Sequence, residues 1–367
     1  MNFRTYFILL AALLLSACSS IGPSEIDVNR SHYNDAIRNT QAQELLRNIV
    51  RLRYCESTYF LNISNVTASY VLTPALAPTN TGIGMSTQQG VGTSRFAQLG
   101  PALTYTDAPT ISYNPITNAD FVNQLLTPVE LKYMHFLLYG GVRDPDLLFR
   151  LVIQRLNEMD NASSISSPKA STVPIYEHYY RFLKLLKKIL VERTAILLPS
   201  EVNGEKKIVV KFIDGKENSR DAMALKRMLE VPLNSKFIIF SIYKMDEPNV
   251  VYVQTRSALG ILNYLSHAVQ VPQADLCSGK APVYRGPDGC PLDFSELFSN
   301  LFAVYTSDSE PKDAYVKVFV NNHWFYIKDC DTDSKLTFNF IGIAILMQSG
   351  NSFSGNTTAP IVTIPIR

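Results

Sequence analysis

The sequence lacks the motifs by which common enzyme classes are recognised. None of its five histidines stands in an H-E-x-x-H pattern, which argues against a zinc protease of that type. It contains no G-x-S-x-G segment, the turn that carries the nucleophile of α/β-hydrolases. It has no C-x-x-C pair, so its cysteines do not have the spacing of a structural zinc site. We therefore expect no enzyme, no metal and no cofactor.

An excess of charge of one sign is also missing. The formal net charge is +2 at pH 7, and charged residues make up 18% of the chain, which argues against a nucleic-acid partner. Apolar residues make up 46%, enough for a sizeable core. No segment repeats with a period of 20–50 residues. The length of 367 residues indicates two domains, or one large domain with insertions.

Hydrophobic runs of membrane-spanning length are absent, and the one notable short run lies at the N-terminus. Arg4 precedes an apolar segment from residue 6 to residue 15, which is too short to span a bilayer core of about 30 Å. The segment Leu15-Ser16-Ala17-Cys18 follows. A charged start, a short apolar stretch and small residues are typical of a secretory signal peptide, and the cysteine makes this one a bacterial lipobox.

This N-terminus predicts a lipid-anchored protein. Residues 1–17 would be removed, and Cys18 would carry a diacylglyceryl group and an acylated amine. Two or more acyl chains anchor a protein stably, so the membrane is an expected partner. Ser19 stands where an Asp would retain the protein at the inner membrane. In a Gram-negative host this predicts the periplasmic face of the outer membrane.

Four further cysteines would lie in an oxidising compartment, where an even number favours disulfides. Cys277 and Cys290 flank a loop rich in Pro, Gly and Asp and close the shortest ring, so this pair is preferred. Cys55 and Cys330 would then form the second pair. Four buried thiols are the alternative.

The pattern of apolar residues predicts an α+β fold with a mostly helical N-terminal half and a mixed C-terminal half. Helices are expected over 29–53, 120–126, 128–139, 144–156, 175–192, 220–229, 257–269 and 335–347. Strands are expected over 59–72, 195–198, 207–213, 236–245, 250–254, 315–320, 324–327 and 361–366. The predicted domains are a signal peptide (1–17), a lipidated tether (18–29), a helical domain (30–159), a linker (160–172) and an α+β domain (173–367).

Residues 73–110 form an unusual stretch within the helical domain. Pro, Thr, Gly, Ala, Ser and Gln dominate it, and Arg95 and Asp107 are its only charged residues. A long stretch of this kind is usually functional or disordered. An extended segment over 102–112 predicts the second half of a long hairpin with a Gly-rich tip.

Two short motifs predict helix starts and turns. Thr127-Pro128-Val129-Glu130 matches a capping box, with Pro at the first helical position. Asn321-Asn322 suits a two-residue hairpin turn. Asp333 or Ser334 is expected to cap the helix over 335–347.

Several segments resemble a widespread family of proteobacterial outer-membrane lipoproteins whose activity is not established. These segments are 44–54, 109–117, 125–128, 255–258, 261–266 and 271–272. The lipobox, size and setting are also similar to those of accessory lipoproteins in the outer-membrane cap of type IVB (Dot/Icm-like) secretion systems. The resemblance implies an envelope location and other envelope proteins as partners, and it assigns no functional residues.

Three arginines are candidates for interaction. Arg47 and Arg51 are four residues apart and share a helix face, where they could meet acidic partners or phosphates, or form internal ion pairs. Arg256 precedes a helix, and it too could meet an acidic partner or a phosphate, or form an internal ion pair.

The expected function is that of a non-enzymatic structural or interaction subunit of an envelope assembly, such as a type IV secretion outer-membrane complex. A glycan-binding module is an alternative, because of Trp324 and the Tyr-rich surfaces. A hydrolase with an unfamiliar site around Asp329, Asp331 or His323 is another. The alternating Asp329, Asp331 and Asp333 do not continue as a calcium loop. A structural role is favoured for His135 and His267.

Overall fold

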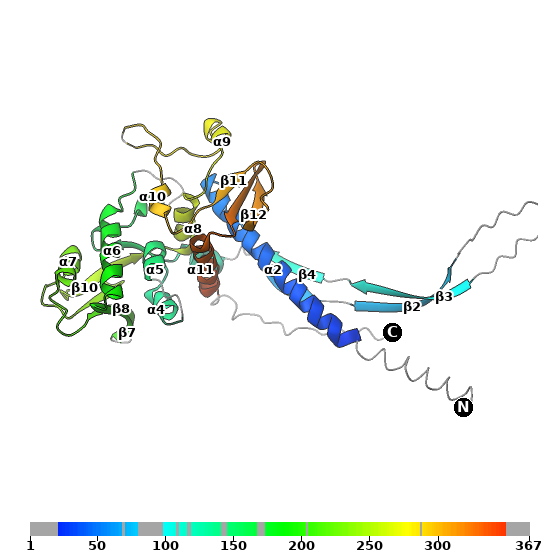
Figure 1. The fold of residues 1–367 in the computed structure, drawn as a ribbon, viewed down its shortest axis with the longest axis horizontal. Coiled ribbons are helices and arrows are strands. Elements are labelled where there is room, and N and C mark those ends of the chain that lie inside the picture. Colours follow the sequence, from blue (N-terminus) through cyan, green and yellow to red (C-terminus); the bar gives the residue numbers. More distant parts are fainter. Residues whose placement is uncertain are drawn as a thin grey trace, which may run out of the picture. The chain divides into compact units, whose positions relative to one another are not determined.

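A computed structural model describes residues 21–67, 70–79, 98–107, 110–115, 119–140, 145–166, 173–202, 205–286 and 288–349 (Figure 1). Contacts divide the chain into two units, residues 1–58 with 118–367 (unit 1) and residues 59–117 (unit 2). Helices precede a mixed C-terminal half, so the predicted α+β class is confirmed. Cys18 and the strand expected over 361–366 lie outside the described residues.

Unit 1 contains a six-stranded sheet with the order β6-β5-β10-β9-β8-β7. All neighbours are antiparallel except β9 and β10, which run parallel. The sequence predicted two strands joined by a short turn there, but β9 ends at Ser241. Residues 242–249 carry the chain back along β9, so that β10 starts beside Ile239 and runs in the same direction. The strands are β5 (Ile153–Leu156), β6 (Met159–Asp160), β7 (Ala195–Val202), β8 (Glu205–Phe212), β9 (Phe237–Ser241) and β10 (Val250–Thr255).

Helix α6 (Glu177–Val191) shows why periodicity predicted the helices well. Its buried positions recur every three or four residues, and its lysines fall on the exposed face. It contacts α7 (Arg220–Met228) and β7, while α4 (Leu131–Gly140) contacts β7 and β8 (Figure 1). The buried residues of α6 are Tyr179, Phe182, Leu183, Leu186 and Ile189.

A three-stranded sheet forms the second β layer of unit 1. Its order is β11-β13-β12, with β11 at Tyr305–Ser307, β12 at Ala314–Val320 and β13 at His323–Lys328. Asn321 and Asn322 connect β12 and β13 with φ angles of 50° and 65°. Asn tolerates this left-handed conformation, so the predicted two-residue hairpin turn is confirmed.

Helix α2 (Ile21–Arg53) begins earlier than predicted and includes most of the segment expected to be a tether. Pro23 does not interrupt it, because a proline in the first turn removes an N–H that has no helical partner. Its C-terminal part packs against α8 (Ala258–Ser266) and β12. Leu46, Ile49 and Val50 are fully buried there.

The predicted linker over 160–172 is wrong for the residues that the structure describes. Asn161, Ala162 and Ile165 are buried, and a short 3-10 helix covers Ser163–Ile165. The amide nitrogen of Asn161 donates to the carbonyls of Arg150 (3.1 Å) and Ile153 (2.6 Å). These bonds join the segment to the core, so residues 118–159 and the C-terminal half belong to one unit.

Two helix boundaries also differ from the prediction. Helix α4 starts at Leu131, because Val129 donates its backbone N–H to the carbonyl of Arg256 (2.9 Å) instead of starting a helix. The Thr127 hydroxyl bonds to Asn123 at the end of α3 (Ala119–Leu126) and does not form the capping box. The helix expected over 144–156 divides into α5 (Pro145–Val152) and β5.

Unit 2 is a two-stranded antiparallel ribbon in two sections. In the first, β1 (Leu61–Thr67) pairs with β4 (Thr110–Pro115). In the second, β2 (Tyr70–Thr79) pairs with β3 (Gln98–Asp107) in ten register pairs. The predicted long hairpin is confirmed, and much of the stretch expected to be a loop is strand. Residues 80–97 lie outside the described residues.

Among the described residues, no helix combines the length and apolar composition needed to cross a membrane.

Candidate functional site

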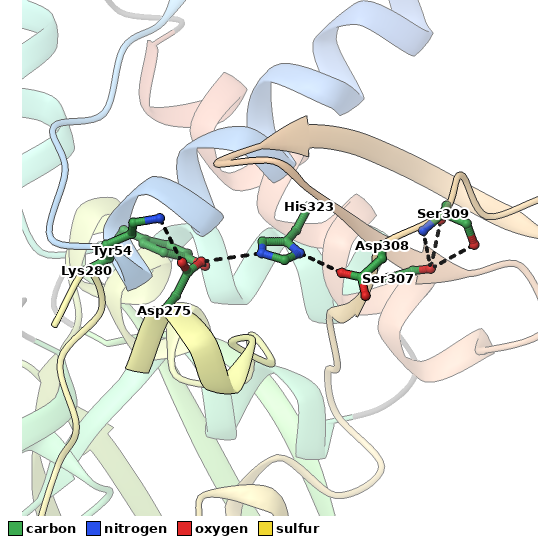
Figure 2. Close-up of polar contacts among 7 residues, drawn as sticks. All are labelled: Tyr54, Asp275, Lys280, Ser307, Asp308, Ser309 and His323. Carbon is green, nitrogen blue, oxygen red and sulfur yellow. Dashed lines mark hydrogen bonds and ion pairs between the residues drawn. The ribbon is translucent and has the colours of Figure 1, made fainter. Parts of the chain in front are cut away.

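A polar cluster of unit 1 surrounds Asp275 (Figure 2). Asp275 lies in α9 (Gln273–Cys277) and its side chain is 3% exposed. The Tyr54 hydroxyl donates to one carboxylate oxygen at 2.8 Å, and the Lys280 ammonium group binds the other at 3.1 Å. The cluster therefore joins the end of α2 to the segment that follows α9, across 221 residues of sequence.

Opposing effects act on the charge of Asp275. Burial by itself raises the pKa of an aspartate, but the hydrogen bonds from Tyr54 and Lys280 outweigh it and hold the pKa of Asp275 below its ordinary value. Burial, followed by the hydrogen bond to Asp275, raises the pKa of Tyr54 well above its ordinary value. The site thus holds a buried carboxylate with a neutral phenol.

His323 extends the cluster towards the surface. Its Nδ1 lies 2.9 Å from the Asp308 carboxylate, which is almost fully exposed, and its Nε2 lies 4.0 Å from Asp275. Figure 2 shows the imidazole between the two carboxylates. When protonated, the ring would form an ion pair on each side.

The arrangement stabilises the fold but does not form a catalytic triad. Ser307 and Ser309 lie beside Asp308 in Figure 2, and hydrogen bonds join these two serines to each other in the turn that follows β11. The Asp308 carboxylate faces solvent, whereas the Asp275 carboxylate is already bound by the Tyr54 hydroxyl and the Lys280 ammonium group. We interpret the cluster as a polar lock between α2, α9 and β13.

Unit 1 also contains a pocket of about 580 Å³. Its volume is within the range of small-ligand sites. Arg53, His267, Phe294 and Asp331 are among its lining residues. Asp331 is already engaged, because its carboxylate accepts hydrogen bonds from the backbone and hydroxyl of Ser334.

His267 is the most unusual side chain of this pocket. Its Nδ1 donates to the carbonyl of Asn263 at 2.8 Å, which leaves a lone pair on Nε2 when the ring is neutral. Nε2 is buried and has no hydrogen-bond partner among the described residues. The ring packs against Tyr284 and Phe294. Burial, together with a smaller effect of the nearby Arg53, lowers the pKa of His267 to about 4.

The burial of His267 and its bond to Asn263 fit the structural role expected for it, but the expected full satisfaction of the ring is not met, because Nε2 has no hydrogen-bond partner among the residues that the structure describes. Nothing is described of the side chain of His135. Asp331, rather than Asp333 or Ser334, caps α11 (Thr332–Ser349), and Asp329 pairs with Lys335 at 2.8 Å. The structure therefore brings His323 to Asp275 and Asp308 instead of to the alternating aspartates.

Arg256 is a core residue, which excludes the surface interaction considered for it. It is 1% exposed, and its guanidinium lies 4.2 Å from the centroid of the Tyr264 ring. Burial lowers the pKa of Arg256. The end of α5, where helix carbonyls lack helical partners, and the first residue of β5 supply three of its five acceptors. Its acceptors are Ser166 Oγ (2.7 Å), the carbonyls of Arg150 (2.9 Å), Leu151 (3.1 Å) and Ile153 (2.8 Å), and the carbonyl of Asn161.

The other two candidate arginines lie on α2. Arg47 is exposed, so it remains available to an acidic group. Arg51 is half-buried, and its guanidinium bonds to Asn48 at 3.4 Å. Arg53, at the end of the same helix, is buried and donates to the carbonyl of Pro282 at 3.0 Å.

The predicted disulfides are not formed in the structure. Backbone hydrogen bonds already close the loop between the preferred pair, including that from Gly286 to Cys290 at 2.9 Å. The sulfur of Cys277 accepts a hydrogen bond from Gln273 at 3.5 Å within α9. The structure has all four cysteines exposed and outside disulfides, namely Cys55, Cys277, Cys290 and Cys330.

Within the described part of the chain, no three His, Cys, Asp or Glu side chains come close enough to hold a metal ion. Comparison with protein-family models, curated proteins and solved structures finds no match for this chain.

Proposed function

We propose that the protein is a lipid-anchored subunit of a bacterial envelope assembly, attached to the outer membrane through Cys18 and acting by contact rather than by catalysis. The observation that carries the proposal is the ribbon of unit 2. Its second section pairs ten residues of β2 with ten of β3. A two-stranded sheet alone is at best marginally stable in water. A ribbon of this length therefore suits a protein that places an arm against another surface.

Unit 1 suits the role of a base for this arm. The Asp275 cluster joins the end of α2 to α9 and β13, and α2 leads back towards the proposed lipid anchor. Arg47 is exposed on the same helix and offers a positive charge to an acidic neighbour. A type IV secretion outer-membrane complex is one assembly that would use such a subunit.

Mild detergent extraction of the tagged protein from its own envelopes tests the proposal. The full chain should elute in a large complex with defined partner chains. A variant in which a short Gly-Ser turn replaces residues 70–107 should elute as a single particle, with a mass below the 41.1 kDa of the full chain. Equal elution of both proteins as single particles would refute the subunit role.

The anchor is tested separately. A Cys18→Ala variant should remain unprocessed and should not incorporate labelled fatty acid. Normal labelling of this variant would refute lipidation at Cys18, whatever the outcome of the extraction.

One surface favours glycan binding as a second candidate function. Phe319 is 48% exposed on β12, and its ring lies 5.2 Å from that of Trp324 on β13. Paired aromatic rings at a surface suit the flat faces of sugars. Sedimentation with purified peptidoglycan should then depend on Trp324 and Phe319, whereas Phe237→Ala, at an exposed position of β9, serves as the matched control.

A further inference from the structure

The pocket of about 580 Å³ is built from segments of unit 1 that lie far apart in the sequence. Arg53 comes from the end of α2, and His267 directly follows α8. Phe294 precedes α10 (Ser295–Phe298), Phe298 ends it, and Tyr305 starts β11. Of the described residues that line the pocket, Arg53 is the one permanent cation. The pocket thus combines aromatic walls with a single guanidinium group.

Arg53 has hydrogen-bond donors that the fold does not use. The residue is 9% exposed, its Nη1 donates to the carbonyl of Pro282 at 3.0 Å, and its guanidinium carbon lies 5.3 Å from the centroid of the Tyr284 ring. In the part of the chain that the structure describes, Nε and Nη2 have no hydrogen-bond partner, and Arg53 forms no ion pair. Both nitrogens reach solvent, because the fully buried polar atoms without a partner do not include them.

The two unused nitrogens of Arg53 form one edge of the planar guanidinium group. The N–H bonds of Nε and Nη2 run side by side on the edge that faces away from the aliphatic stem. Such a fork matches the two oxygens of a carboxylate or a phosphate, which accept two parallel hydrogen bonds. An open fork on a residue that lines a pocket therefore suits an anionic ligand.

The charge of Arg53 also lacks a carboxylate partner. Burial lowers the pKa of Arg53, and the groups that act against this effect are Tyr284, Cys55 and Tyr54. A charge removed from water without a counter-charge is costly, so binding of an anion at this point is favoured. His267 adds no second positive charge at neutral pH, because its pKa is about 4. The site therefore offers one positive charge to a ligand.

Other residues of the lining limit the charge and shape of that ligand. Asp293, Asp331 and Asp333 line the same pocket. They repel a phosphate dianion about twice as strongly as a carboxylate monoanion, because the Coulomb energy is proportional to the charge. Phe294 and Phe298 offer apolar surface to the remainder of a ligand.

We propose that this pocket binds a small carboxylic acid as its monoanion, with the carboxylate on Nε and Nη2 of Arg53 and an apolar body against Phe294 and Phe298. This inference goes beyond the subunit role and does not depend on the lipid anchor.

Ligand-observed NMR titration of the full mature chain carrying Cys18→Ala, which has no acyl chains and needs no detergent, tests the proposal. The probes are 3-phenylpropionate, its neutral amide 3-phenylpropionamide, and inorganic phosphate as a competitor. We expect a Kd of about 1 mM or below for 3-phenylpropionate. The amide and phosphate should bind at least about tenfold more weakly, because the amide lacks the charge and phosphate is repelled by the three aspartates.

Three variants test whether the carboxylate binds at Arg53. Arg53→Lys keeps the charge and a donor for Pro282 but removes the fork, so 3-phenylpropionate should bind about five- to tenfold more weakly. Arg38→Lys, the same change at an exposed position of α2, is the matched control and should bind like the parent protein. Asp333→Asn removes a negative charge from an exposed position of the lining and should strengthen binding about twofold.

Hydrogen exchange locates the ligand without any substitution. Amides of residues 292–305 should gain protection when 3-phenylpropionate is added, while those of α6 should not change. Absence of binding by 3-phenylpropionate, equal binding of the acid and its amide, tighter binding of phosphate, or unchanged binding by Arg53→Lys would overturn the proposal. If Arg53→Lys does not fold, unchanged binding by Asp333→Asn would overturn it instead.

Discussion

Acidification from about pH 7.5 to about pH 5 should destabilise unit 1 through His267. The ring is neutral and buried in the native state, where its pKa is about 4 instead of 6.5. As pH falls, the unfolded chain binds a proton at this residue first, and folding must then expel that proton. The stabilising effect of a neutral His267 is therefore complete above pH 6.5 and is lost as pH falls towards 4.

Linkage gives the size of the effect. A difference between pKa values of 6.5 and about 4 corresponds to a loss of about 2 kcal/mol at pH 5, rising to about 3 kcal/mol below pH 4. Asp275 does not interfere, because its pKa lies below 3.8 and its contribution is lost only at still lower pH. A loss of 2 kcal/mol is a large fraction of the stability of a typical domain.

Urea unfolding monitored by the single tryptophan measures this loss, because Trp324 lies in β13 of unit 1. His267→Gln can keep the hydrogen bond to Asn263 but does not titrate, so its stability should change by about 2 kcal/mol less over the same pH interval. His178→Gln, at an exposed position of α6, should behave like the parent protein. Equal pH dependence in the parent and in His267→Gln would refute the reasoning.

Three further predictions concern stability and covalent state. Arg256→Met should destabilise unit 1 by about 3–5 kcal/mol in urea unfolding, because the buried carbonyls at the end of α5 lose their donors; a loss below 1 kcal/mol would contradict this. Asp275→Asn should cost about 1–3 kcal/mol, since Lys280 loses its charged partner and Tyr54 a strong acceptor; an unchanged midpoint would refute the polar lock. Cys277 and Cys290 should react with a thiol reagent in the native protein purified without reductant, because both thiols are exposed. If intact-mass analysis instead showed no labelling and a loss of two hydrogens, the predicted disulfide would be present.

Local patterns were sufficient where one element alone determines the structure. The spacing of Phe182, Leu186 and Ile189 predicts α6, because one face of a helix must be buried. Asn321-Asn322 predicts the β12–β13 turn, because Asn tolerates a positive φ. The sparse charge and alternating pattern near residues 61–112 predicted the long hairpin, although not how far its strands extend.

Contacts between distant segments determined the rest. Tyr54 and Asp275 are 221 residues apart, and no local pattern marks two residues that meet only after α2 and α9 pack. The sequence left open whether Arg256 meets a partner or an internal group, and the structure shows that the carbonyls of Arg150, Ile153 and Asn161 provide acceptors that bury it.

The sequence by itself determined the class of fold, most helices, the β12–β13 turn and the prediction of a lipid anchor, because each depends on residues that are neighbours along the chain. Only the tertiary structure decided that residues 160–166 belong to the core, that His323 faces Asp275 and Asp308, and how far the strands of the ribbon pair. The physical reason is that burial, ion pairing and strand register depend on which distant segments come together. A segment that packed against a different part of the chain would differ in all three.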